Sequence, residues 1–144
     1  MMNDKNVLYV CLKLNPESRG RLRELTCEMF NDEYCRLLCD HLTLAYGPEV
    51  RDFDESLIGR KATISASKVA FDENIAALVV DRDQVKRLGM TSRRTPHITL
   101  AIFDHSTQPA YSNHMLNSEH EVIEFAPEDE IRLTGEIVAV MKRK

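Results

Sequence analysis

Two short stretches of this sequence carry a histidine and a threonine two positions apart. The first begins His41-Leu42-Thr43 and the second begins His97-Ile98-Thr99. Because successive side chains of a strand point to opposite faces, each histidine shares a face with its own threonine. The apolar residues between them take the opposite face, where they can be buried. We interpret the two polar faces as the two sides of one site, which face each other across a phosphate.

The chemistry available to these residues is proton transfer. Cleavage of a phosphodiester needs a base for the attacking oxygen and an acid for the leaving oxygen, and His41 and His97 can supply both, because the ordinary pKa of histidine is ~6.5. The hydroxyls of Thr43 and Thr99 are placed to donate hydrogen bonds to the phosphate oxygens of the transition state. The sequence does not decide which histidine is acid and which is base. The scheme requires neither a metal nor a cofactor, and we expect none.

Two alternatives compete with this interpretation. A single His-x-Thr on a strand is more often structural than catalytic, but here both motifs are followed by Leu-Ala and both end similar units of the chain. The spacing Cys35-x3-Cys39-x-His41 could be imagined as a metal site, yet it lacks the paired Cys-x2-Cys of strong zinc signals. We expect the cysteines to be reduced thiols.

Further candidates for substrate binding lie beside the two motifs. Arg93 and Arg94 precede His97, and arginine suits bidentate recognition of phosphate; the alternative is a solvated loop. Tyr46 ends the first His strand and could stack on a base. Strand parity directs Tyr46 away from His41 unless the chain turns early before Gly47, so the alternative is a packed aromatic at the sheet edge.

The elements that must position these residues form a repeated unit of strand, helix and His strand. This duplication predicts two lobes related by a pseudo-twofold axis, in which the equivalent His strands meet at the centre. The first unit comprises a strand at 7–14, a helix from 16 to about 30 and the His strand at 41–46; the second comprises a strand at 75–80, a helix at about 84–88 and the His strand at 97–102.

The rest of the chain predicts smaller features. Residues 34–38 could form a helical turn, residues 51–60 read as a loop, and Gly135 is a candidate bulge or bend. The remaining predicted elements are a strand starting at 61 and reaching towards 71, which pairs with 75–80 as a hairpin, a short helix at 110–116 and a long strand at 130–142.

Composition limits the class of protein. A chain of 144 residues with 43% hydrophobic and 29% charged residues is typical of a single globular domain, here residues 1–144. The net charge of −4 argues against a broad nucleic-acid surface, although a local basic site for a small phosphate or an RNA end remains compatible. The apolar runs are too short to cross a bilayer and no signal segment precedes them, so we expect a cytoplasmic protein without an obligatory protein partner.

At this point a family resemblance is visible. The two motifs resemble the paired H-x-T signature of the 2H phosphoesterase superfamily, over about Lys5 to Met141. The stretch His97-Ile98-Thr99-Leu100-Ala101, followed by Thr107-x-Pro109-x-x-Ser112-Asn113, is similar to the cyclic phosphodiesterase domain of fungal-type tRNA ligases.

The resemblance implies a bilobal α+β fold, with two antiparallel sheets around a central cleft and helices outside. It implies metal-independent hydrolysis of a 2′,3′-cyclic phosphate on an RNA terminus or a small nucleotide, with His41 and His97 catalytic and Thr43 and Thr99 on the phosphate. It also suggests that Ser112 and Asn113 line the cleft, although they could simply start or cap the short helix.

Two other functions stay open at this stage. The same chemistry could degrade cyclic oligonucleotide signals, as some phage-borne 2H proteins do. Alternatively, the chain could be a non-catalytic module that binds nucleotides or RNA ends. Matched proton-transfer groups at both motifs argue against pure binding.

Overall fold

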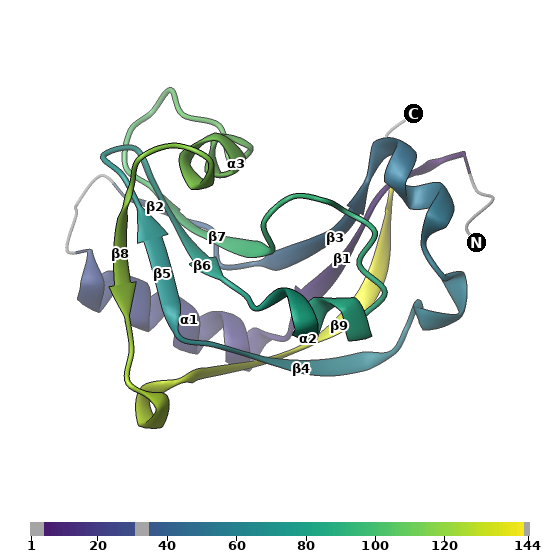
Figure 1. Cartoon of the computed structure of the whole chain (residues 1–144), viewed down its shortest axis with the longest axis horizontal. Coiled ribbons are helices and arrows are strands. Elements are labelled where there is room, and N and C mark those ends of the chain that lie inside the picture. The colour runs from purple at the N-terminus through teal and green to yellow at the C-terminus, as the bar shows by residue number, and fades with distance from the viewer. Residues whose placement is uncertain (1–4, 31–34, 143–144) are drawn as a thin grey trace.

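The structure is a computed structural model, and it describes residues 5–30 and 35–142. Strands dominate the described part of the chain, with a few helices between them (Figure 1). The strands are β1 (Val7–Leu14), β2 (Arg36–Leu37), β3 (His41–Tyr46), β4 (Lys61–Ala66), β5 (Lys68–Phe71), β6 (Ile75–Val79), β7 (His97–Ile102), β8 (Glu121–Glu124) and β9 (Ile131–Met141). The helices are α1 (Pro16–Met29), α2 (Arg82–Arg87) and α3 (Tyr111–Leu116), with short 3₁₀ helices η1 (Gly47–Asp52), η2 (Glu55–Leu57) and η3 (Pro127–Asp129).

The strands of the described residues form one antiparallel sheet in the order β4-β9-β1-β3-β7-β6-β5-β8, with β2 paired to β7. Figure 1 shows this sheet curled, with few helices around it. The α+β class is therefore confirmed. The arrangement as two lobes with separate sheets is not confirmed, because the strands form one continuous order in which β3 and β7 join the two halves through the pair Leu42–Ile98.

The repeated unit has the spatial arrangement that the sequence predicts. The first unit is β1, α1 and β3, and the second is β6, α2 and β7. In the sheet these strands lie in the order β1-β3-β7-β6. From either end of this order, the first strand of a unit is followed by the His strand of the same unit. The two His strands are therefore neighbours at the centre, with the first strand of each unit on the outside.

A single row of apolar side chains crosses this centre. Leu12, Leu42, Ile98 and Leu78 are partners in successive strand pairs, and all four are fully buried. Each such side chain contributes ~1.5–3 kcal/mol when it leaves water. Since side chains alternate, burial of this row directs His41, Thr43, His97 and Thr99 to the opposite face.

Several local predictions need correction. The described part of the 34–38 turn contains the strand β2, which gains its pairing from β7. The strand predicted from 61 towards 71 is two strands, because β4 pairs with β9 while β5 pairs with β6 and β8. The 51–60 loop contains part of η1 and all of η2. Strand β8 was not predicted, and its partner β5 lies about fifty residues away in the chain.

Gly135 does not form a bulge. It lies in register opposite Leu14 on one side and Ala62 on the other. A Cβ at this position would collide with the carbonyl of Lys13. The glycine is therefore required by close approach of two backbones. Among the described residues, no helix is long and apolar enough to cross a bilayer.

Candidate functional site

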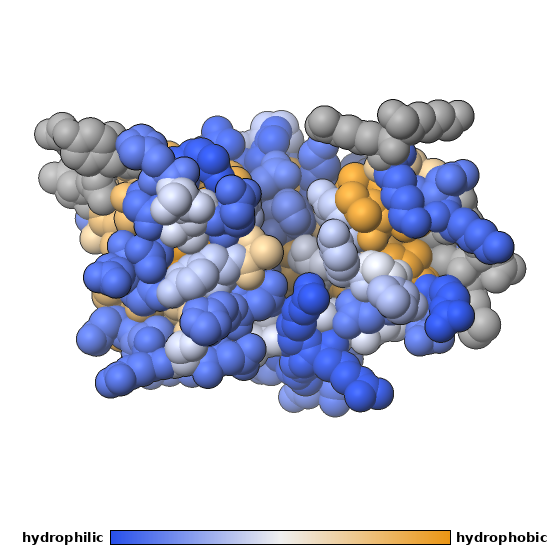
Figure 2. Space-filling model, turned by 90° about the horizontal axis from the view of Figure 1, so that it is seen from above, coloured by the Kyte–Doolittle hydropathy of each residue, from blue (hydrophilic) through white to orange (hydrophobic). Residues whose placement is uncertain are grey.

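A cavity of about 650 Å³ lies over the junction of the two His strands, and His41, Thr43, His97 and Thr99 all line it. Viewed from above, the molecule is hollowed between two flanks, and most of the visible surface is hydrophilic (Figure 2). In an antiparallel ladder, residues on either side of the Leu42–Ile98 pair face each other in reverse order. Each histidine is therefore the cross-strand neighbour of the threonine in the other motif.

Both nitrogens of the His97 ring have protein partners. The Nδ1 atom is 2.8 Å from the carbonyl of Thr95, which can only accept, so Nδ1 carries a hydrogen. The Nε2 atom is 2.8 Å from the Ser112 hydroxyl. Burial lowers the pKa of His97; the hydrogen bond to Thr95 opposes this, and the nearby positive charges of His41 and Arg94 add to it.

His41 has a different environment. Its Nδ1 atom lies 3.3 Å from a carboxylate oxygen of Asp40, whose other oxygen lies 3.3 Å from Arg19 on α1. The ring of Tyr9 stacks on the imidazole with centroids 5.5 Å apart. These contacts fix the His41 ring from one edge and one face.

Tyr46 lies in the same cavity, contrary to the parity argument. The pairing of β1 with β3 shifts register between Val10 and Cys11, so Tyr46 comes opposite Tyr9. The two rings stack at 6.1 Å, and the Arg94 guanidinium lies 5.9 Å from the Tyr46 ring centre. Tyr46 is 44% exposed, which leaves much of this ring available to a ligand.

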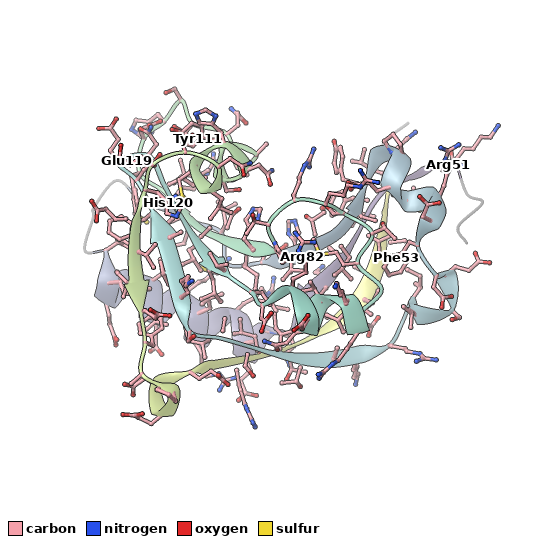
Figure 3. The ribbon with its side chains drawn as sticks, in the orientation of Figure 1. Arg51, Phe53, Arg82, Tyr111, Glu119 and His120 are labelled. Carbon is pink, nitrogen blue, oxygen red and sulfur yellow. The ribbon has the colours of Figure 1, made fainter. Side chains whose placement is uncertain are left out.

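The loop before β7 supplies one of the two predicted arginines. Arg94 lines the cavity, whereas Arg93 is exposed and is not among the lining residues. Arg82 of α2 fixes this loop by donating to the carbonyls of Ser92, Arg93 and Arg94 at 3.4, 3.3 and 2.7 Å. In Figure 3, Arg82 lies between α2 and this loop.

Helix α3 brings Ser112 and Asn113 to the cavity wall. Ser112 is buried and bonds both polar residues of the second motif, whereas Asn113 is only partly buried. Tyr111 of the same helix, labelled in Figure 3, donates to Asp72 at 3.0 Å. This bond and the burial of Met115 against Ala70, Ile75 and Ala77 hold α3 on strands β5 and β6.

Sequence reasoning missed several residues that shape the site. Tyr9, Asp40 and His114 all line the cavity. Asp40 has a sequence signal, since an acidic residue stands directly before the histidine. Tyr9 and Arg82 have none, because their contacts depend on strand pairing and on a loop conformation.

The described residues contain no group of three or more His, Cys, Asp or Glu side chains that could hold a metal ion. Cys39 is buried, and its thiol contacts the hydroxyl of Thr26 and the carbonyl of Leu100. Burial raises the pKa of Cys39 to about 11 and that of Cys11 to about 12. Both thiols are therefore core side chains.

Comparison with known proteins gives one family. Residues 23–140 match the family model described as the fungal tRNA ligase phosphodiesterase domain. This range contains both His-x-Thr motifs and the Pro-x-x-Ser-Asn stretch. No curated protein matched the chain in the search.

Proposed function

The chain belongs to the fungal tRNA ligase phosphodiesterase domain family, and from that premise we propose that it hydrolyses a 2′,3′-cyclic phosphate without a metal. The observation that carries the proposal is the meeting of both His-x-Thr pairs in one cavity. Such a meeting is what the resemblance of the two motifs to the 2H phosphoesterases implies. The substrate is an RNA terminus or a nucleotide that carries the cyclic phosphate.

His97 is suited to be the general base. Its lowered pKa leaves the imidazole neutral at pH 7, with Nδ1 holding its only hydrogen and a lone pair on Nε2. In this scheme Nε2 takes a proton from the attacking water as the water oxygen bonds to phosphorus. His41, oriented by Asp40 and Tyr9, gives a proton to the sugar oxygen that leaves. One P–O bond forms and one breaks, and the phosphate becomes a monoester.

The remaining groups at the cavity bind the phosphate oxygens and the nucleobase of the substrate. Thr43 and Thr99 donate to the phosphate oxygens, where each pre-placed donor contributes ~3 kcal/mol to the transition state. Arg94 lies at the cavity wall, where its guanidinium suits a phosphate oxygen or a stacked base. Tyr46 offers its exposed ring to the base, and Asn113 offers an amide at the same wall.

The test is turnover of a substrate panel in the presence of a chelator. A 2′,3′-cyclic mononucleotide, an RNA with a 2′,3′-cyclic end and a cyclic oligonucleotide are compared. We expect at least one cyclic-phosphate substrate to be opened, and we expect His41→Ala and His97→Ala each to lower kcat by ~100-fold or more. His105→Ala is the matched control, because this histidine is exposed and does not line the cavity.

Each departure from that result has a defined meaning. Turnover that survives both histidine substitutions contradicts the acid–base assignment. Preference for the cyclic oligonucleotide would replace the RNA-end substrate with a signal nucleotide. Tight product binding without turnover of any panel member would contradict the enzymatic proposal and favour a binding module.

A further inference from the structure

The hydroxyl of Ser112 lies between the two polar side chains of the second motif. It is 2.8 Å from His97 Nε2 and accepts a hydrogen bond of 3.2 Å from Thr99 Oγ1. Its third neighbour is the carbonyl of Pro109, also at 2.8 Å. Ser112 is only 1% exposed, so its partners come from the protein.

The position of each hydrogen follows from these partners. Because Nδ1 of His97 always donates to Thr95, the neutral ring has a lone pair on Nε2, and the Ser112 hydroxyl donates to it. In the protonated ring, Nε2–H donates to Ser112 Oγ, whose own hydrogen then turns to the Pro109 carbonyl. That carbonyl also accepts from the backbone N–H of Ser112 at 3.2 Å, so it keeps a donor in both states.

We propose that Ser112 is a positioning residue that keeps the His97 ring hydrogen-bonded in both proton states. Its hydroxyl donates to Nε2 of the resting ring and turns to the Pro109 carbonyl as Nε2 takes the proton of the attacking water, after which Nε2–H donates to Ser112 Oγ. Thr99 donates to Ser112 Oγ only until a phosphate is bound, because its one hydroxyl hydrogen then turns to the phosphate. This inference rests on the proposed function, which requires His97 to cycle between the two states. It replaces the substrate-binding role predicted for Ser112, since the hydroxyl is used within the protein.

Other groups around the cavity also act on the charge of His97. Arg94 on the loop before β7 and His41 on β3 oppose its protonation directly. Tyr9 on β1, Asp40 before β3 and His114 on α3 line the same cavity, while the neighbour of His97 on β6 is the apolar Val79. All of these stay unchanged when Ser112 is substituted. A difference between wild type and Ser112 variants therefore isolates the hydroxyl.

The first test is an NMR titration of the His97 ring, which needs no substrate. A hydrogen bond stabilises an ionised group more than a neutral one, so Ser112→Ala should lower the pKa of His97 by about one unit, a tenfold loss of proton affinity. Ser112→Cys keeps most of the side-chain volume and should shift the pKa in the same direction. Ser112→Thr keeps the hydroxyl and should restore the wild-type titration.

Ser118→Ala is the matched control, because the Ser118 hydroxyl bonds the His114 carbonyl just past the end of α3. It should leave the His97 titration unchanged. A His97 pKa that is unchanged or raised in both Ser112→Ala and Ser112→Cys would overturn the proposal.

Kinetics separate positioning from substrate contact. We expect Ser112→Ala to lower kcat by about tenfold and to move the limb of the pH–rate profile set by His97 to lower pH, with KM within about twofold. A large rise in KM at unchanged kcat would instead make Ser112 a substrate contact. Absence of turnover in the wild type would contradict the proposed function, while the NMR titration would still decide whether Ser112 sets the proton affinity of His97.

Discussion

The two histidines occupy unequal environments although their motifs are alike. His97 has protein partners at both ring nitrogens and is the more desolvated, whereas His41 is held by a carboxylate and a stacked tyrosine. A buried neutral imidazole and an imidazole beside a carboxylate suit opposite directions of proton transfer. This asymmetry is the reason why we propose opposite roles for the two histidines.

The lowered pKa of His97 predicts how stability depends on pH. Between the unfolded value of ~6.5 and the lower folded value, the unfolded chain binds more protons, so the free energy of unfolding rises with pH. The contribution of His97 is full above pH ~6.5 and is lost as pH falls through its folded pKa. Urea unfolding should therefore show that the free energy of unfolding falls more between pH 7.5 and pH 5 in wild type than in His97→Gln.

His105→Gln is the control for that experiment. Because the His105 side chain is exposed, this variant should lose as much free energy of unfolding between pH 7.5 and pH 5 as wild type does. An equal loss in wild type and His97→Gln would mean that His97 is not the desolvated group that the geometry describes.

Among the elements, one register shift and one close backbone contact lie near the site. The register shift between Val10 and Cys11 brings Tyr46 opposite Tyr9 and into the cavity. The close contact at Gly135 lets β9 pair with β1, which is the neighbour of the first His strand in the sheet. The register shift therefore explains why the rings of Tyr9 and Tyr46 stack in the cavity.

Substitution of Gly135 should show how tight this contact is. Gly135→Ala places a methyl group against the Lys13 carbonyl, so we expect a loss of about 2 kcal/mol in the free energy of unfolding. Gly20→Ala is the matched control, because Gly20 lies in α1 with nothing within 4 Å of a Cβ. It should stabilise the protein by ~0.5–1 kcal/mol through helix propensity. Chemical denaturation of both variants checks the pair, and a neutral Gly135→Ala would contradict the close packing.

At the scale of the whole molecule, one sheet and one main core connect the two units. The core cluster includes buried residues from both, among them Leu12, Leu42, Leu78 and Ile98. The site lies where the units meet, so its geometry depends on their remaining joined. Strand pairing between the halves is sparse at the centre, where side-chain packing beneath the sheet holds them together.

Removing one central side chain should test this connection. Leu42→Ala leaves a cavity beneath the junction, so we expect the free energy of unfolding to fall by ~2–5 kcal/mol. Both units should still unfold in one transition. Hydrogen exchange of amides in β1 and β6 should report the same loss. Val122→Ala, at a 48% exposed position on β8, should change stability by less than ~0.5 kcal/mol. Separate transitions for the two units would contradict a shared core.

Sequence alone predicted the repeated unit and the four polar residues that line the cavity. Alternation of polar and apolar residues is a local property, so it identified both His strands, their buried faces and the four cavity-lining residues His41, Thr43, His97 and Thr99. Contacts between distant residues have no such local signal. Only the folded chain shows that the sheet is continuous, that the rings of Tyr9 and Tyr46 stack, and that Ser112 bonds the ring of His97. The physical reason is that pairing register and helix docking depend on the whole core, whereas side-chain alternation depends only on the backbone of one strand.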